Sequence, residues 1–187
     1  NLSFLNNIFP HMKFVYIIRN PYDAIMSSLK KKNMSLDGEE FKRILERKNT
    51  YFFKKYKLNV QDVKKWSELT QRALRWRVEV ENAIYSNIPS SKLYVIRYED
   101  LLNYTQKQVE LLFEWLGWPI TSQTIQFIEQ SLGKKKPHLV DSFISSGYFG
   151  VYRKESIKKK GRHRMTQSEY QQIYDIVHES PVMSYWA

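Results

Sequence analysis

Two short apolar runs stand out in the pattern of hydrophobic and polar positions along the chain. Residues 12–18 and residues 92–97 are rich in β-branched and aromatic side chains, a pattern that predicts strands buried in a sheet. Polar sequence follows each run, Arg19-Asn20-Pro21 after the first and Tyr98-Glu99-Asp100 after the second. We therefore expect two buried strands, each followed by residues that can carry chemistry.

Helical patterns lie between the two strands. Asn20 is a favourable N-cap and Pro21 suits the first helical position, so a helix is predicted to begin there and to end at the lysines of residues 30–32. Apolar residues at helical spacing predict a second helix over residues 68–83, which Pro89 would end. The positions predicted to face the core are Leu69, Ala73, Trp76, Val80, Ala83 and Ile84.

Three more helices are predicted in the second half of the chain. Residues 105–116 have an amphipathic pattern that stops at Gly117. Thr121 can cap a helix that runs to about residue 132. Thr166, three residues before Glu169, predicts a capping box at the start of the last helix.

Two stretches have weaker patterns. Residues 33–68 are polar and rich in Lys and predict one or two helices, whereas residues 133–160 predict a long loop of the kind that is usually functional. Strands separated by helices predict an α/β fold with a parallel sheet, in one domain over residues 1–187. No apolar run in these residues is long enough for a transmembrane helix.

The charge balance narrows the classes of partner. The chain has 30 Lys and Arg against 19 Asp and Glu, a net charge of +11, which predicts attraction to nucleic acid, anionic membrane, sulfated glycans or a phosphate-rich cofactor. It has no Cys, which excludes disulfides, thiolate zinc sites and a Cys nucleophile. Its four His are scattered, without the spacing of metal ligands, and we expect no metal.

The most informative positions follow the predicted strands, because ligands of open α/β sheets bind beyond the carboxyl ends of the strands. Arg19 lies where a strand ends and a helix begins, so its guanidinium and the free N–H groups of the helix can share an anion. Ser27 lies two turns into the helix and can offer its hydroxyl to the same anion. The alternative is that Arg19 pairs with Asp23 and that Ser27 is a surface residue, and spacing alone leaves both open.

Residues 19–27, RNPYDAIMS, resemble the R-N-P-x-D-x-x-x-S motif of sulfotransferases that use 3′-phosphoadenosine 5′-phosphosulfate (PAPS). The resemblance implies that Arg19 and Ser27 hold the 3′-phosphate of this cofactor. Residues 97–101, RYEDL, resemble a second segment of the family, which implies that Tyr98 contacts the adenine. Residues 113–117 resemble the F-L-G ending of the helix that follows this segment in the family.

A third segment, late in the chain, resembles the family's R-K-G-x-x-G-D-W-K region. The resemblance implies that Arg153 and Lys154 also grip the 3′-phosphate. Glu155 replaces the Gly of the motif, and the G-D-W is absent. The basic run over residues 159–162 is an alternative for the same role, or a solvated charge run.

The resemblance implies a P-loop-NTPase-like three-layer sandwich with a parallel sheet, incomplete at its N-terminal side. The implied reaction transfers a sulfuryl group from PAPS to an acceptor hydroxyl and leaves 3′,5′-adenosine bisphosphate. In the family the phosphosulfate loop and the base precede the R-N-P motif, so we expect this chain to be the C-terminal part of a longer domain. It would supply the 3′-phosphate and adenine side of the site, with its catalytic residues unknown, and would be inactive by itself.

Several alternatives concern function, acceptor and compartment. The alternative to an enzyme is a non-catalytic protein with a degenerate sulfotransferase fold, which binds an anionic glycan or another polyanion through its Lys clusters. A nucleotide kinase would need a Walker loop, which is absent, and we expect no specific nucleic-acid partner. The acceptor is expected to be a carbohydrate, a protein or a small alcohol. Sequons at Asn1, Asn33 and Asn103 favour a type II membrane protein of the Golgi lumen, with a cytoplasmic enzyme as the alternative.

Overall fold

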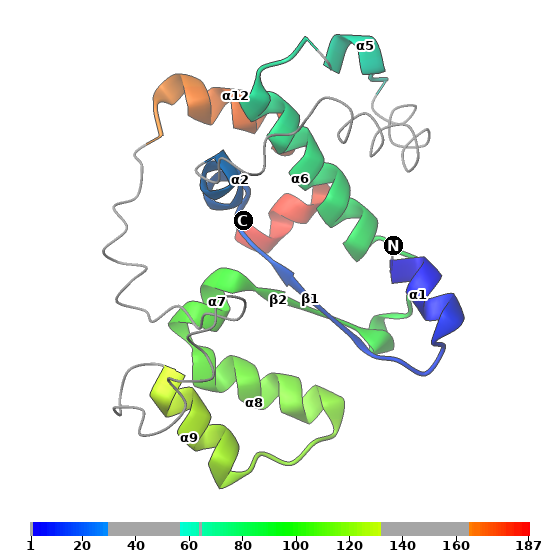
Figure 1. Ribbon diagram of the computed structural model, residues 1–187, viewed down its shortest axis with the longest axis vertical. Helices are drawn as coiled ribbons and strands as arrows, with labels where there is room; N and C mark the ends of the chain where they lie inside the picture. The colour runs from blue at the N-terminus through cyan, green and yellow to red at the C-terminus, as the bar shows by residue number, and fades with distance from the viewer. Residues whose placement is uncertain (1, 30–56, 64, 132–164) are drawn as a thin grey trace, which may run out of the picture. The chain divides into compact units, whose positions relative to one another are not determined.

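The computed structural model describes residues 2–29, 57–63, 65–131 and 165–187, and the chain forms two compact units (Figure 1). The first unit comprises Asn1–Arg97 together with Arg164–Ala187, and the second comprises Tyr98–His163. We describe each unit by itself. The sequence prediction of one domain over residues 1–187 stays a prediction.

The first unit holds the sheet and the helices that pack on it. In chain order its elements are α1 (Leu2–Ile8), β1 (Phe14–Ile18), α2 (Pro21–Leu29), α5 (Val60–Val63), α6 (Glu68–Ile84), the 3₁₀ helix η2 (Ser90–Lys92), β2 (Leu93–Arg97), α12 (Gln167–Val177) and the 3₁₀ helix η3 (Pro181–Trp186). The second unit contains α7 (Tyr98–Asn103), α8 (Thr105–Leu116) and α9 (Ser122–Ser131).

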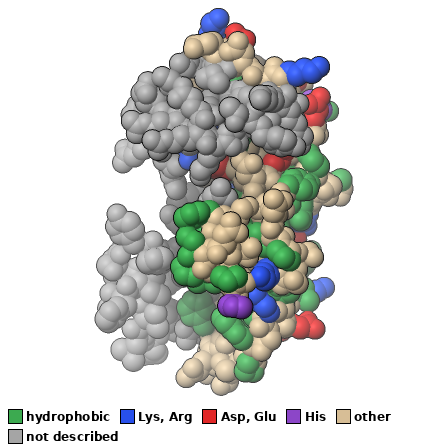
Figure 2. Space-filling model, turned by 90° about the vertical axis from the view of Figure 1, so that its right-hand side faces the viewer, with side chains coloured by type: hydrophobic (Ala, Val, Ile, Leu, Met, Phe, Trp, Pro, Cys, Tyr) green, Lys and Arg blue, Asp and Glu red, His purple; other side chains and the backbone are tan. Residues whose placement is uncertain are grey.

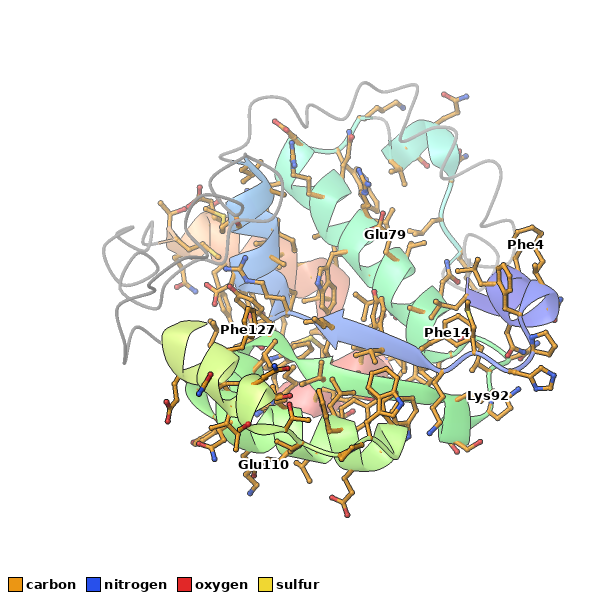
Figure 3. The ribbon with its side chains drawn as sticks, turned by 60° about the horizontal axis from the view of Figure 1, so that its bottom comes forward. Phe4, Phe14, Glu79, Lys92, Glu110 and Phe127 are labelled. Atoms are coloured by element: carbon orange, nitrogen blue, oxygen red, sulfur yellow. The ribbon has the colours of Figure 1, made fainter. Side chains whose placement is uncertain are left out.

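Both predicted strands are confirmed, and they pair in parallel. The register runs from Phe14 beside Leu93 to Ile18 beside Arg97. In Figure 3, Phe14 at the start of β1 and Lys92 just before β2 mark the same end of the sheet. The described residues are mostly helical and form this two-stranded parallel sheet. The α/β class is therefore confirmed, whereas the three-layer sandwich stays a prediction.

Alternation along β1 decides which side chains enter the core, because successive residues of a strand point to opposite faces. Ile18 is buried in the core cluster and Tyr16 packs against it. Burial and, to a smaller extent, the negative charge of Glu79 raise the pKa of Tyr16 to about 12, so this phenol stays neutral at physiological pH. Val15 and Ile17, on the opposite face, are 43% and 52% exposed.

Helix α6 is the central helix of the first unit. The Ser67 hydroxyl caps it by accepting a hydrogen bond from the N–H of Thr70. The predicted core positions are buried, with the exception of Ile84, which is half-buried. Leu74 and Val78, outside the predicted face, are buried as well, so most of the helix surface is covered.

The helix predicted over residues 68–83 is confirmed, since α6 runs over Glu68–Ile84 and ends before Pro89. The hydroxyl of Ser86 donates to the carbonyl of Ala83 at 2.7 Å. Such a local side-chain bond gives a carbonyl of the last turn a partner outside the helical ladder. Tyr85 is the C-cap of the helix, and its N–H bonds to the carbonyl of Glu81.

The C-terminal segment completes the core of the first unit. The predicted capping box is confirmed, since the Thr166 hydroxyl accepts from the N–H of Glu169 and the Glu169 carboxylate accepts from the N–H of Thr166. Ile173 and Val177 of α12 are fully buried in a cluster with residues of β1, α2 and α6. Val182 of η3 is buried in the same cluster.

Two arginines bind this segment to the rest of the first unit. Arg77 of α6 donates to the carbonyl of Ile176 at 2.6 Å, and Arg97 at the end of β2 donates to the carbonyl of Tyr185 at 2.5 Å. Arg77 also forms an ion pair with Glu81 at 2.9 Å, and both side chains are only 6% exposed. A charged pair this deep is costly to desolvate, and its hydrogen bonds offset that cost.

The second unit shows how local signals set helix ends. Helix α8 has the predicted bounds, and Gly117 ends it with a φ of 75° in the left-handed region. The N–H of Trp118 bonds to the carbonyl of Phe113, and their rings meet edge to face at 6.0 Å. Thr121 caps α9 by accepting from the N–H of Thr124 at 3.2 Å, as predicted. Helix α7 was not predicted as a helix.

Several predictions lie outside the described residues. They are the lysines expected to close the first helix, residues 33–56 of the predicted helices, the end of the helix predicted to reach residue 132, and the loop over residues 133–160. Within the described ranges, no helix combines the length and the apolar character needed to cross a membrane.

Exposed apolar side chains gather on α1 and its connection to β1. Phe4 and Ile8 lie one turn apart on α1, Met12 follows in the connection to β1, and all three are largely exposed. Figure 2 is turned so that the side of α1 faces the viewer, and hydrophobic side chains cover part of that surface. Together with Val15 and Ile17, these residues form the apolar surface that we call the α1–β1 face.

We expect Arg77→Ala to lower the free energy of unfolding by about 3–5 kcal/mol, because it leaves the carboxylate of Glu81 buried without its partner. Arg75→Ala is the matched control, since Arg75 pairs with Glu79 on the same helix but in an exposed position. It should cost about 1 kcal/mol or less. Urea denaturation of both variants measures the two losses, and equal losses would contradict the structural role of the buried pair.

Gly117→Ala should destabilise the chain by about 1 kcal/mol through backbone strain alone. A Cβ atom at this position meets nothing within 4 Å, so a steric clash contributes nothing. Gly117→Asn should cost less, because Asn tolerates the left-handed region better than Ala. Thermal unfolding of the two variants tests this order, and a larger loss for Asn would show that φ is not the cause.

Candidate functional site

The candidate site begins where β1 passes into α2. The last residue of the strand, Ile18, is buried, and Arg19 follows it half-buried. The side-chain oxygen of Asn20 accepts from the N–H of Tyr22 at 3.1 Å, and its carbonyl accepts from the N–H of Ala24 at 2.9 Å. Asn20 is therefore the N-cap of α2, as the sequence predicted.

The first turn of α2 has few N–H groups to offer an anion. Pro21 has none, and the N–H of Tyr22 bonds to the side chain of Asn20. Of residues 21–23, Asp23 alone keeps an N–H that the cap does not use, and its own carboxylate lies in the same turn. The sequence predicted that several N–H groups of the helix can share an anion with Arg19, and the structure offers fewer of them than expected. The side chains of Arg19 and Ser27 are left as the main donors.

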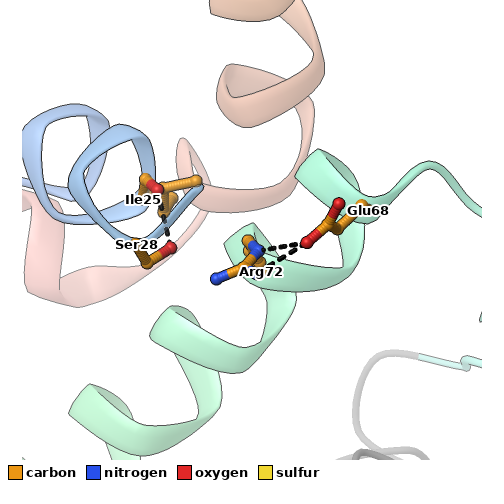
Figure 4. Close-up of polar contacts among 4 residues, drawn as sticks. All are labelled: Ile25, Ser28, Glu68 and Arg72. Atoms are coloured by element: carbon orange, nitrogen blue, oxygen red, sulfur yellow. Dashed lines mark hydrogen bonds and ion pairs between the residues drawn. The ribbon is translucent and has the colours of Figure 1, made fainter. Parts of the chain in front are cut away.

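Two adjacent serines of α2 differ in their hydrogen bonding. The Ser28 hydroxyl donates to the carbonyl of Ile25 at 2.6 Å, three residues earlier (Figure 4). The Ser27 hydroxyl is half-buried and makes no hydrogen bond with any residue that the structure describes. Ser27 also lies on the same side of the helix as Asn20 and Ala24, at spacings of seven and three residues. Its hydroxyl is therefore the one that can donate to a ligand.

The alternative pairing of Arg19 with Asp23 is not found. Asp23 is exposed and has no ion-pair partner within the described part of the chain. The Nε atom of Arg19 is buried, so the start of its guanidinium group lies against the protein instead of extending into solvent. A surface ion pair with Asp23 therefore does not explain why an arginine occupies position 19.

The second strand ends level with the first, because Arg97 is paired with Ile18. Arg97 is the last residue of the first unit at this point, and Tyr98 opens α7 in the second unit. The structure therefore places Arg19 and Ser27 on consecutive elements of one unit and Tyr98 in the other. Arg153 and Lys154 lie outside the described residues, so their predicted role stays a prediction.

Sequence analysis missed a row of aromatic rings beside the start of α2. Tyr22 stacks on Tyr170 of α12 with ring centroids 4.7 Å apart and planes 3° from parallel. Tyr174 also stacks on Tyr170, with ring centroids 6.1 Å apart, and His178 stacks on Tyr174 at 4.6 Å. The signal in the sequence is the spacing of four residues between these three rings, which places them on one side of a helix.

Tyr22 is held in its neutral form by this environment. Burial raises its pKa well above the ordinary value, and a hydrogen bond with the hydroxyl of Tyr170 raises it further. Among the residues described, no group of three His, Asp or Glu side chains is placed to hold a metal ion.

Comparison with models of protein families matches residues 1–122 to the sulfotransferase family. The matched part covers more than half of the chain and contains both strands, Arg19, Ser27 and Tyr98. The chain belongs to the sulfotransferase family, and the resemblance noted in the sequence is thereby confirmed. Searches of curated proteins and of solved structures found no significant match.

Asn20→Ala should destabilise the chain by about 1 kcal/mol, because it removes the N-cap of α2. Asn20→Asp keeps an acceptor oxygen at the same position and should retain most of the stability. Asn59→Ala provides a matched control, since Asn59 makes the same contact with the N–H of Gln61 but caps a helix of four residues. Chemical denaturation compares the three variants, and an equal loss for Asn20→Ala and Asn59→Ala would contradict a special role for the first cap.

Proposed function

We propose that this chain is part of a PAPS-dependent sulfotransferase and that the turn from β1 to α2 binds the 3′-phosphate of the cofactor. The observation that carries the proposal is the pair of donors there. A half-buried guanidinium follows the strand, and the hydroxyl of Ser27 on the next helix has no partner among the described residues. Charge-assisted hydrogen bonds from such donors are the strong contacts of protein–phosphate recognition.

The donor set fits a phosphate dianion. Arg19 presents a planar fork of N–H groups, and Ser27 adds a neutral donor from the same side of α2 as the N-cap. The Asn20 cap and buried Pro21 fix where the helix starts, and so fix the spacing between the two donors. When bound, PAPS supplies the sulfuryl group that passes to the acceptor hydroxyl, with adenosine 3′,5′-bisphosphate as the other product.

Three further residues belong to the proposed cofactor site. Tyr98 follows the second strand, and we assign it the adenine contact, because an aromatic ring offers a stacking face to a base. Arg153 and Lys154 would add positive charge to the 3′-phosphate. Their assignment is supported by the family resemblance and by the net charge of +11.

We infer that the acceptor is a hydroxyl of a carbohydrate or a protein in the secretory pathway. The sequons support this inference, and the Asn103 side chain is exposed at the end of α7, where a glycan would find room. The positive net charge favours an anionic acceptor over a neutral small alcohol.

The proposal predicts that the chain binds adenosine 3′,5′-bisphosphate and that Arg19→Ala weakens binding about 10- to 100-fold, the usual range for a hydrogen bond to a charged group. Ser27→Ala should weaken it about three- to tenfold. Ser28→Ala is the control and should leave the affinity unchanged, because its hydroxyl is bonded to Ile25. Isothermal titration calorimetry measures all four proteins.

Adenosine 5′-monophosphate, which lacks the 3′-phosphate, completes the test. Its affinity should be the same for the parent chain and for Arg19→Ala. Equal binding of the bisphosphate by the parent chain and Arg19→Ala would refute the proposed site. Salt-dependent binding to heparin that Arg19→Ala does not change, with no nucleotide binding, would favour the non-catalytic polyanion-binding protein instead.

A further inference from the structure

We propose that Tyr170 of α12 is a positioning residue for the 3′-phosphate site, acting through its ring contact with Tyr22. The proposal rests on the proposed function, since it concerns how the donors of α2 are held in place. The contact joins residues far apart in the sequence, one in the second helical position of α2 and the other in the second turn of α12. Both belong to the first unit.

The geometry of the ring pair makes it a stiff connection. The rings of Tyr22 and Tyr170 are 4.7 Å apart at their centroids and within 3° of parallel. Stacked aromatic pairs have a preferred geometry, so the contact favours one arrangement of the two rings.

The contact fixes the rotation of α2 about its own axis. Successive helical residues are about 100° apart, so Tyr22 and Ser27 point about 140° apart around the helix. A contact on the Tyr22 side can therefore hold the helix without covering the hydroxyl of Ser27. Because Arg19 is attached to the strand and Ser27 to the helix, the rotation of α2 sets how the two donors face each other.

The second turn of α12 is itself well anchored. Thr166 and Glu169 close the capping box one residue before Tyr170, and Ile173 on the next turn is fully buried. Tyr170 nevertheless remains 42% exposed, so it contributes little to the core for a side chain of its size. Of the ring contacts that Tyr170 makes in the described residues, the one with Tyr22 joins it to α2, whereas the one with Tyr174 stays within α12.

Tyr174 is a matched control on the same helix. It is 39% exposed and stacks on Tyr170 and His178. No ring contact joins it to Tyr22 in the described residues. Tyr174→Ala therefore removes a ring of similar exposure and leaves the stack of Tyr22 on Tyr170 in place.

The experiment measures binding of adenosine 3′,5′-bisphosphate and of adenosine 5′-monophosphate by calorimetry. Tyr170→Ala should weaken bisphosphate binding about three- to tenfold, the range expected for one aromatic pair, with monophosphate binding unchanged. Tyr170→Phe keeps the ring and should restore most of the affinity, and Tyr174→Ala should bind like the parent chain. A merely structural role would not change the ratio between the two ligands. Parent-like bisphosphate binding by Tyr170→Ala would overturn the proposal.

Hydrogen exchange separates this proposal from the proposed function. If the parent chain binds no bisphosphate, the proposed function fails, and the amide exchange of residues 22–26 then tests the positioning role alone. Faster exchange in Tyr170→Ala than in Tyr174→Ala would support it, because α2 has lost its anchor. Equal exchange in the two variants would overturn it. Tyr170→Leu keeps apolar bulk without a ring, and replaces Tyr170→Ala if that variant fails to fold.

Discussion

Ile18 and Arg97 stand side by side at the ends of two parallel strands, and the candidate site depends on this pairing. Parallel strands deliver their following residues to the same edge of a sheet, which is where α/β proteins bind their ligands. Arg19 comes to that edge because the buried Ile18 fixes the strand in its register, since a shift of one residue would turn Ile18 outwards. Arg19, a proposed phosphate donor, thus owes its position to an apolar neighbour.

Helix α6 provides the support behind that edge. Its residues contact the sheet, α2 and the C-terminal segment within one apolar cluster. The buried pair of Arg77 and Glu81 lies on this helix, and the hydrogen bond from Arg77 to the carbonyl of Ile176 accounts for a buried arginine there. Ile176 lies in the last turn of α12. The C-terminus of a helix has unsatisfied carbonyls and a partial negative charge, so the guanidinium of Arg77 is a suitable partner there.

The sequence predicted the elements whose signals are local. Gly117 and Thr166 mark helix ends through their own backbone or hydroxyl, and both predictions are confirmed. Arg19 and Ser27 were found because a motif of nine residues contains them. The hydrogen bond of Ser86 beside the end of α6 was not predicted, because it depends on which carbonyls remain free once the helix has formed.

Contacts between distant segments were beyond the reach of the sequence. The sequence around Tyr22 contains nothing that predicts its contact with Tyr170, and the same is true of the sequence around Tyr170. The same holds for Arg77, whose charge alone predicts an exposed residue. The adenine side of the site and the role of residues 153 and 154 stay predictions, because Tyr98 belongs to the second unit and the other two residues lie outside the described ranges.

The boundary of the family match has a practical consequence for the first unit. The match ends at residue 122, whereas Ile173, Val177 and Val182 of its apolar cluster lie beyond that boundary. A recombinant fragment cut at residue 122 would keep the motif and lose one wall of the core. The uncovered side of α6 would then meet water and would favour aggregation during expression. The segment that matches the family therefore cannot be treated as an independently folding module.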